Sequence, residues 1–157
     1  MASESLADIL NQNPWFQSLE PAHFEKLMAI AGISAWEDGQ TIFAEGVKDD
    51  QLYLILEGRV ALDKSVPGRG RVTILTLSPS EIFGWSAVVP VVGMRMATAR
   101  AVGPTRAVTF DSVALRQACD DDHDLGYLVY RRLTNIIAGR LSATRLQLLD
   151  IYAGSRK

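Results

Sequence analysis

Glycine interrupts the middle of the chain at short intervals, and this spacing restricts the folds that are open to it. Between residues 33 and 111, short segments rich in Val, Ile, Leu, Thr and Tyr alternate with glycine and proline. Several short strands at near-regular spacing indicate a small sandwich or a barrel-like roll. We predict strands near 33–36, 40–44, 51–57, 58–64, 71–77, 96–103 and 105–110. Bends are expected at Gly39, Gly46, Gly58, Gly68, Gly70, Gly84 and Gly103.

Helical periodicity flanks this region on both sides. Residues 3–32 space their apolar side chains as a helix does, with a break at Asn13-Pro14, and Gly32 is expected to end the helical part. A short helix is predicted over 112–119. The acidic run after it offers N-caps for a long helix over about 122–152. That helix would be ~45 Å long, more than a small roll can cover, so part of its apolar ridge needs another surface.

The bulk composition is that of an ordinary soluble globular protein. Apolar residues make up 48% of the 157 residues and charged residues 22%. A net charge of −2 disfavours nucleic acid as the main partner, because phosphate contacts need a surplus of Lys and Arg. The single cysteine, Cys119, cannot form an internal disulfide. The N-terminus does not resemble a signal peptide, and no run approaches the ~18 apolar residues of a membrane span. We expect a cytoplasmic protein.

The patterns that mark catalytic sites are missing. The sequence contains neither Gly-x-Ser-x-Gly nor His-Glu-x-x-His. The run Asp120–Asp124, which includes His123, could hold a metal ion or cap a helix. It lacks the spacing of a calcium loop, which favours the cap. We expect no enzyme, no metal site and no cofactor.

A glycine turn that leads to one arginine is the most informative motif. Phe83-Gly84-Trp85-Ser86 is followed by Arg95-Met96-Ala97-Thr98, with Arg95 ten residues after Trp85. Free backbone N–H groups at the start of a short helix, together with one guanidinium, can hold an anion. Alternatively, Arg95 is a strand-end arginine that pairs with a carboxylate.

This motif resembles the phosphate-binding cassette of cyclic nucleotide-binding domains, as in the bacterial catabolite-activator and fumarate/nitrate-reduction regulator families. Residues 39–46 resemble the early strand and turn of that family, and residues 50–60 resemble its central hairpin. Residues 140–145 resemble its dimerising helix. The resemblance implies one domain over 1–157, mostly β, built as a double-stranded β-helix (a jelly-roll-like β-roll). Its expected parts are N-terminal helices (3–32), the roll (33–111) and C-terminal helices (112–152).

The resemblance also implies a ligand site. Arg95 would meet the cyclic phosphate, with the backbone of residues 84–86 around it, and Arg140 and Thr144 would reach the base from the long helix. The implied ligand-binding residues are Gly84, Trp85, Ser86, Arg95, Met96, Thr98, Arg140 and Thr144.

Trp85 departs from the family pattern. Nucleotide-binding members usually carry Glu there, and its carboxylate accepts a hydrogen bond from the ribose 2′-hydroxyl. An unpaired buried hydroxyl costs roughly 1–3 kcal/mol, about ten- to hundred-fold in affinity. Trp85 either fills the core or lines a modified pocket where its flat face could stack on a ligand.

Two functions remain open. In the first, the chain senses a small anion such as cyclic AMP, cyclic GMP or a related compound, with weak nucleotide binding because of Trp85. It would form a homodimer through about 125–151 and pass the signal to an effector protein. In the second, it is a degenerate domain that serves as a dimerisation or docking scaffold, with Trp85 filling the old pocket. Because the chain stops at Lys157, without a helix-turn-helix, we expect no direct DNA binding.

Overall fold

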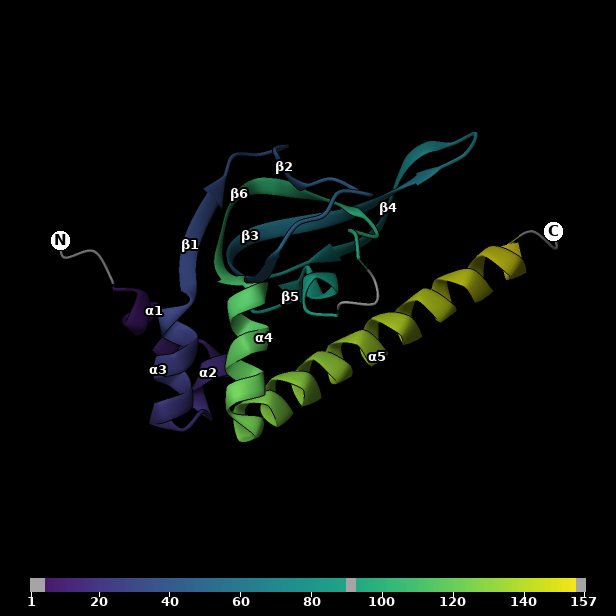
Figure 1. The fold of residues 1–157 in the computed structure, drawn as a ribbon. Helices are drawn as coiled ribbons and strands as arrows, with labels where there is room; N and C mark the ends of the chain where they lie inside the picture. Colours follow the sequence, from purple (N-terminus) through teal and green to yellow (C-terminus); the bar gives the residue numbers. More distant parts are fainter. Residues whose placement is uncertain (1–4, 90–92, 155–157) are drawn as a thin grey trace.

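Two long, bent strands form the centre of the fold. The computed structural model describes residues 5–89 and 93–154 (Figure 1). Strands β3 (Gln51–Val66) and β6 (Thr98–Asp111) run antiparallel, with Gln51 opposite Asp111 at one end and Asp63 opposite Thr98 at the other. Each joins two of the predicted strands into one, because the chain bends at Gly58 and Gly103 without breaking the pairing.

Shorter strands complete an antiparallel sheet of order β1-β6-β3-β4, with β2 paired to β6 and β5 paired to β3. Glycines 68 and 70 form the β3–β4 hairpin turn, as predicted; both have positive φ. The sheet, the flanking helices and the long C-terminal helix confirm the predicted mostly β fold. The remaining strands are β1 (Ala31–Trp36), β2 (Thr41–Phe43), β4 (Gly70–Leu77) and β5 (Ile82–Phe83).

Three short helices precede the sheet: α1 (Leu6–Gln12), α2 (Pro14–Gln17) and α3 (Pro21–Ala29). The prediction that Gly32 ends this helical part was wrong, because α3 ends at Ala29 and Gly32 already lies in β1. A Cβ at Gly32 would lie 3.2 Å from Oγ1 of Thr109, so close strand packing explains this glycine. Residues 3 and 4 of the predicted helical range lie outside the described residues.

Two helices follow the sheet, α4 (Ser112–Asp121) and α5 (His123–Gly154). Asp122 lies between them. Its carboxylate accepts a hydrogen bond from the Leu125 backbone N–H at 3.2 Å and one from Lys26 Nζ at 2.7 Å. The predicted helix cap is therefore confirmed at Asp122. From this junction α5 runs along the roll, and its last turns extend toward the β3–β4 hairpin (Figure 1).

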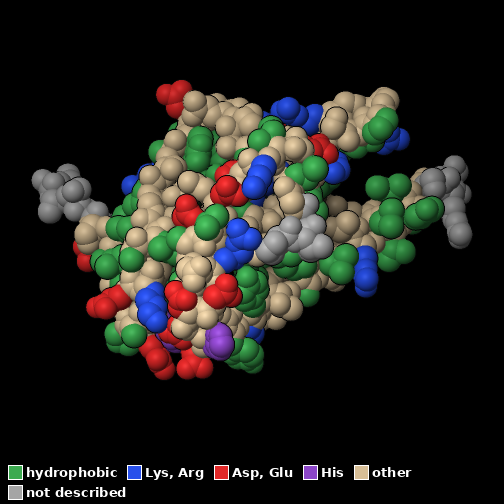
Figure 2. All heavy atoms as spheres, in the orientation of Figure 1, with side chains coloured by type: hydrophobic (Ala, Val, Ile, Leu, Met, Phe, Trp, Pro, Cys, Tyr) green, Lys and Arg blue, Asp and Glu red, His purple; other side chains and the backbone are tan. Residues whose placement is uncertain are grey.

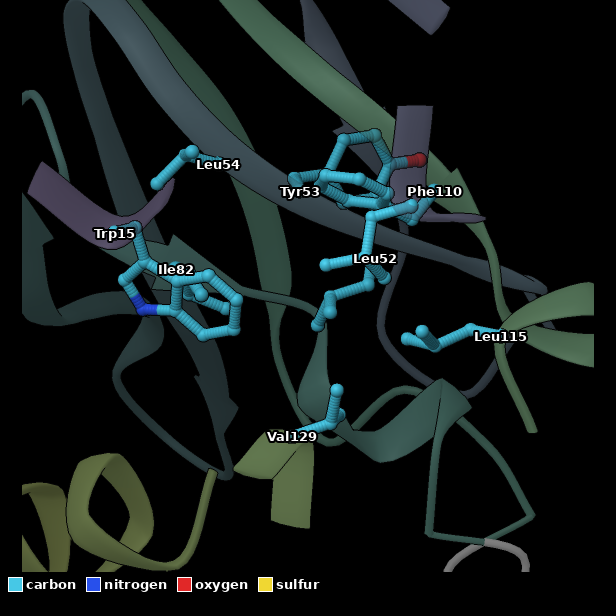
Figure 3. A pocket seen from close by; sticks show the side chains of 9 residues that line it. Trp15, Leu52, Tyr53, Leu54, Ile82, Phe110, Leu115 and Val129 are labelled. Carbon is cyan, nitrogen blue, oxygen red and sulfur yellow. The ribbon is translucent and has the colours of Figure 1, made fainter. Parts of the chain in front are cut away.

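The core has two parts. Inside the roll, Tyr53 stacks on Phe83 with 4.7 Å between ring centroids. The second part joins the helices to the end of the roll through Leu10, Phe16, Leu27, Leu54, Val108, Leu115, Leu125 and Leu133, among others. Figure 3 shows the side chains around a gap of about 10 Å³ in this region. A gap this small holds one water at most, and its lining is almost wholly apolar, so it is a packing defect.

Apolar side chains gather on the projecting end of α5. Figure 2 shows them in green along this part of the helix, beyond the bulk of the roll. Leu146 is 62% exposed and Ile151 is 68% exposed. Within the described ranges, no helix combines the length and the apolar character that crossing a bilayer requires.

Candidate functional site

Arg95 is buried and points into the protein. Arg95 is only 2% exposed. Both terminal nitrogens of its side chain contact protein oxygens. Nη1 donates to the Gly84 carbonyl at 2.7 Å and to the Ser86 hydroxyl at 3.2 Å. Nη2 donates to the Gln51 carbonyl at 2.5 Å. The arginine therefore fastens the turn after β5 to the start of β3.

A carboxylate and two aromatic rings surround the same guanidinium. Asp49 Oδ2 lies 3.2 Å from Arg95 Nη2 and also accepts a hydrogen bond from the Tyr53 hydroxyl at 2.9 Å. The guanidinium carbon lies 4.1 Å from the Phe43 ring centroid, within the range of cation–π attraction. Burial and the Asp49 carboxylate both raise the pKa of Tyr53, so its hydroxyl stays protonated. Arg95 thus pairs with a carboxylate, as the alternative interpretation held, and is also turned inward.

One polar atom of Arg95 is left over. Among the residues that the structure describes, its buried Nε has no hydrogen-bond partner. Buried polar groups are nearly always paired, and leaving one unpaired typically costs about 1–3 kcal/mol. This N–H is therefore a buried donor for which the described residues supply no acceptor.

Gly84 gives the turn its shape. Its φ of +80° lies in the left-handed region, which favours glycine, and a Cβ would lie 3.0 Å from Arg95 Nη1. The short 3-10 helix η1 (Trp85–Ala87) follows directly. Glycine therefore lets the backbone approach the guanidinium and begins the turn that carries Trp85 and Ser86.

A small cavity of about 60 Å³ lies beside this turn, and we call it the arginine cavity. Phe43, Leu62 and Ala97 form part of its wall. Six of the eight predicted ligand-binding residues complete the lining: Gly84, Trp85, Ser86, Arg95, Met96 and Arg140.

Trp85 takes part in both roles that the sequence left open. Its partly buried side chain packs against the core cluster between the helices and the roll. It also lines the arginine cavity. The tryptophan therefore forms a wall of the cavity, and some space remains beside it.

Arg140 reaches the arginine cavity from α5. Its Nη2 donates to the Ile82 carbonyl, which ties the middle of the helix to strand β5. Burial lowers the pKa of its guanidinium, and Glu81 acts in the opposite direction. Within the described residues Arg140 forms no ion pair, so its charge is partly buried without a matching carboxylate in contact.

Thr98 and Thr144 are not among the residues that line the arginine cavity. The Thr98 hydroxyl accepts a hydrogen bond from the Glu45 backbone N–H at 3.0 Å, which joins the turn after β2 to β6. Thr144 is exposed, and its hydroxyl donates to the Arg140 carbonyl one turn earlier in α5 at 2.8 Å. Both hydroxyls thus serve local structure.

The structure adds three neighbours of Arg95 that the sequence did not single out: Phe43, Asp49 and Gln51. Asp49 and Gln51 contribute a carboxylate and a backbone carbonyl, and neither role has a motif that distinguishes it from other loop residues. The pair Asp49-Asp50 before β3 was the only available signal for a carboxylate near Arg95.

The acidic run Asp120–Asp124, which spans the end of α4 and the start of α5, serves structure at Asp122. Besides capping α5, Asp122 lies 3.4 Å from Nε2 of His23. Across the part of the chain that the structure describes, no three His, Cys, Asp or Glu side chains are grouped so that they could hold a metal ion.

Comparison with known protein families matches residues 34–122 to the cyclic nucleotide-binding domain. This match spans more than half of the chain. The fold and the buried arginine after a glycine turn agree with it, and the chain belongs to the cyclic nucleotide-binding domain family.

Two relatives by sequence are bacterial. A CRP-like cAMP-activated global transcriptional regulator of Mycobacterium tuberculosis is 32% identical over 145 residues, which cover 92% of this chain and 62% of the regulator. The cyclic AMP receptor protein of Thermus thermophilus is 30% identical over 125 residues, covering 77% of this chain and 57% of the receptor. The chain thus spans less than two thirds of either relative.

Solved structures show the same fold. A cyclic nucleotide-binding domain from Methylobacillus flagellatus KT superposes with a TM-score of 0.77 at 26% identity, over 92% of this chain and 81% of that one. The catabolite activator protein of Thermus thermophilus gives a TM-score of 0.71 at 26% identity, over 90% of this chain and 63% of that one.

Proposed function

We propose that this chain is a regulatory module that senses a small anionic ligand in the arginine cavity. The observation that carries the proposal is Arg95, a buried guanidinium that faces inward and whose Nε lacks a partner among the described residues. An anion that accepts a hydrogen bond from Nε would satisfy this donor with a charge-assisted bond, which is stronger than a neutral one.

Cyclic AMP and cyclic GMP are the first ligands to consider. Membership in the family and the similarity to cAMP-activated regulators support this choice. Trp85 weakens the support for a cyclic nucleotide, because none of the described lining residues carries a carboxylate that could accept a hydrogen bond from the ribose hydroxyl. We therefore expect a cyclic nucleotide to bind weakly.

Ligand entry is coupled to the position of α5. The arginine cavity measures about 60 Å³, whereas sites for small molecules typically measure ~300–1,000 Å³. The cavity must therefore widen, and Arg140 from α5 forms part of its wall. Gln147 ties α5 to the roll a second time, through a 2.9 Å hydrogen bond from Nε2 to the Ile74 carbonyl. Widening the cavity shifts the helix, and a ligand that prefers the wide state favours the shifted position.

The signal leaves through the exposed part of α5, which we propose as a dimer interface. Leu125, Val129 and Leu133 of the predicted interface are buried in the protein's own core and are unavailable to a partner. A second stripe follows the 4-3 spacing of a coiled-coil seam. It consists of Tyr130, Thr134, Ile137, Leu141, Thr144, Leu148 and Ile151. Of these, Leu141 is 50% exposed and Leu148 is 53% exposed.

We place this module in the cytoplasm as one domain over residues 1–157, acting on an effector protein. Cys119 is buried as a free thiol, which fits a reducing compartment.

A second function, a scaffold without a ligand, is favoured by one observation. The terminal nitrogens of Arg95 already contact Gly84, Ser86, Gln51 and Asp49, so the protein itself occupies most of the anion site. In this case the arginine only fastens the turn, and the domain serves dimerisation or docking.

Thermal unfolding with millimolar cyclic AMP or cyclic GMP separates the two functions. A ligand at ~100 times its dissociation constant stabilises the folded state by about 2.7 kcal/mol, which raises the melting temperature measurably. We expect a rise for wild type and a larger rise for Trp85→Glu, whose carboxylate restores an acceptor for the ribose hydroxyl. Arg95→Ala should remove the rise.

Because Arg95 is buried, the melting temperature of Arg95→Ala without ligand shows first whether that variant folds. If Arg95→Ala does not fold, the comparison of wild type with Trp85→Glu still tests nucleotide binding. No rise in wild type or in Trp85→Glu with either nucleotide would contradict sensing of cyclic nucleotides and favour the scaffold.

A further inference from the structure

The arginine cavity contains two guanidinium groups and no acid among its described lining residues. Arg95 enters from the segment before β6, and Arg140 enters from α5. A carboxylate in the lining would repel a second negative charge on a ligand. The residue composition of this cavity therefore tolerates a ligand with more than one negative charge.

Arg95 contributes little uncompensated charge. Asp49 lies 3.2 Å from its Nη2 and carries the opposite charge, and its terminal nitrogens already donate to protein oxygens. What it offers a ligand is the single N–H of Nε, which is unpaired within the described chain. One negatively charged oxygen can use that donor.

Arg140 is the cavity's uncompensated cation. Among the described residues, the side chain of Arg140 donates one hydrogen bond, to the neutral carbonyl of Ile82. No carboxylate of the described residues lies within ion-pair distance of its guanidinium. Glu81 acts on its pKa only from farther away. A guanidinium has five N–H donors, so most of those on Arg140 remain for an anion.

The two arginines are anchored close together. Arg140 donates to the carbonyl of Ile82, and Arg95 donates to the carbonyl of Gly84, two residues along the chain. Both guanidinium groups also line the same small cavity. One compact anion in this cavity can therefore contact both arginines.

We propose that Arg140 is a second anion-binding residue, and that the arginine cavity binds a dianion more tightly than it binds the singly charged cyclic nucleotides. The ligand class is a phosphomonoester or a small dicarboxylate, which share two negative charges on a small body. This inference rests on the proposed function, and it names the chemistry of the ligand at the same site. For such a dianion, a glutamate carboxylate at position 85 would repel the second negative charge.

Two nucleotides that differ in their phosphate test the proposal. Adenosine 5′-monophosphate and 3′,5′-cyclic AMP share base and ribose, but at pH 7.5 the monoester carries close to two negative charges and the cyclic diester carries one. We expect calorimetric titration of wild type to give a dissociation constant at least ~10-fold lower for the monoester, a difference of about 1.4 kcal/mol. Succinate, titrated in parallel, distinguishes a dicarboxylate site from a phosphomonoester site, and tight binding of either dianion supports the proposal.

Two variants show whether Arg140 is responsible. Arg140→Gln should bring the two nucleotide constants to about the same value. Arg145→Gln is the matched control: this arginine lies on the same helix and is exposed, so the wild-type preference should remain.

The inference is overturned if cyclic AMP binds wild type as tightly as both dianions do, or if Arg140→Gln keeps the preference. If cyclic AMP binds as tightly as both dianions, the preference for dianions is wrong, but the proposed function as a ligand sensor is still supported. If neither nucleotide nor succinate binds wild type, both the inference and the proposed function are wrong.

Discussion

At the scale of single residues, Gly58 shows how one missing side chain shapes the roll. Its φ is +80°, and a Cβ there would lie 2.4 Å from the Pro104 carbonyl oxygen. Strand β3 therefore bends against the corresponding bend of β6. The β3–β6 register shifts between Ile55 and Glu57, and again between Glu57 and Arg59, across the glycine. The glycine spacing of the sequence was sufficient to predict a bend here, but only the structure shows what the bend packs against.

Gly58→Ala should be much more destabilising than Gly39→Ala. Gly39 has nearly the same φ, +82°, but a Cβ there meets nothing within 4 Å. Both substitutions place alanine in the left-handed region, at about 1–2 kcal/mol. Gly58→Ala adds a steric overlap that we expect to cost ~1–3 kcal/mol more. Urea unfolding of the two variants measures the difference, and equal losses would mean that the close contact with β6 does not restrict this position.

At the arginine site, the sequence was sufficient to predict some of the contacting residues but not their partners. Arg95 and Gly84 could be placed in one site because their spacing follows a family pattern. The pairing of Arg95 with Asp49 could not be predicted from the sequence, because it depends on how the loop before β3 packs against the turn after β5. Thr98 was assigned to the ligand although its hydroxyl bonds to Glu45, since a threonine beside an arginine gives no sign of which group it contacts.

At the scale of elements, the α4–α5 junction connects the N-terminal helices to the long helix. Asp122 accepts hydrogen bonds from the first turn of α5 and from Lys26 of α3. The hydrogen bond from Lys26 is the main cause that lowers the pKa of Asp122 to about 2. Arg132 adds a second tie, since Nη2 donates to the Ser18 hydroxyl at 2.6 Å.

This junction predicts a dependence of stability on pH. A carboxyl whose pKa is lowered on folding stabilises the folded state above its ordinary pKa of ~3.9, and loses that contribution as pH falls toward the folded value of about 2. Wild type should therefore lose more stability between pH 4 and pH 2 than Asp122→Asn, measured by thermal unfolding. Asparagine is also a good N-cap, so this variant removes the charge and keeps the cap. Equal slopes for the two proteins would show that the Lys26–Asp122 pair does not contribute.

The two faces of α5 were only partly separable from the sequence. One apolar ridge was predicted, and the structure divides it into a buried face at Leu125, Val129 and Leu133 and an exposed stripe that continues to Ile151. The sequence could not show this division, because apolar residues occur around much of the helix and the roll decides which of them are covered. Ile136, one turn beyond Leu133, also packs against the protein's own core.

At the scale of the whole molecule, α5 connects the arginine cavity to the proposed dimer interface. Arg140 is the residue common to both regions, since it lines the cavity and lies on the helix that carries the exposed stripe. Under the proposed function, a ligand that widens the cavity would therefore change how two copies of α5 meet.

Leu148→Glu should dissociate the proposed dimer, because it places a charge in the seam of exposed apolar residues. Leu146→Glu is the control: Leu146 is 62% exposed, against 53% for Leu148. It lies about 140° around the helix from Leu141 at roughly 100° per residue, on the side opposite the seam. Sedimentation should give a dimer for wild type and Leu146→Glu and a monomer for Leu148→Glu. A monomeric wild type would contradict the interface.

The most direct test observes the Nε–H of Arg95, the donor that has no acceptor among the described residues. In a nitrogen-15 spectrum of the arginine side chains, the Arg95 Nε–H signal is identified by its absence in Arg95→Lys. Cyclic AMP and adenosine 5′-monophosphate are then added in turn to millimolar concentration. The proposed function predicts that this signal shifts with at least one of them and that the shift saturates, because an anion oxygen becomes its hydrogen-bond acceptor. A signal that stays in place with both nucleotides would contradict ligand sensing at Arg95.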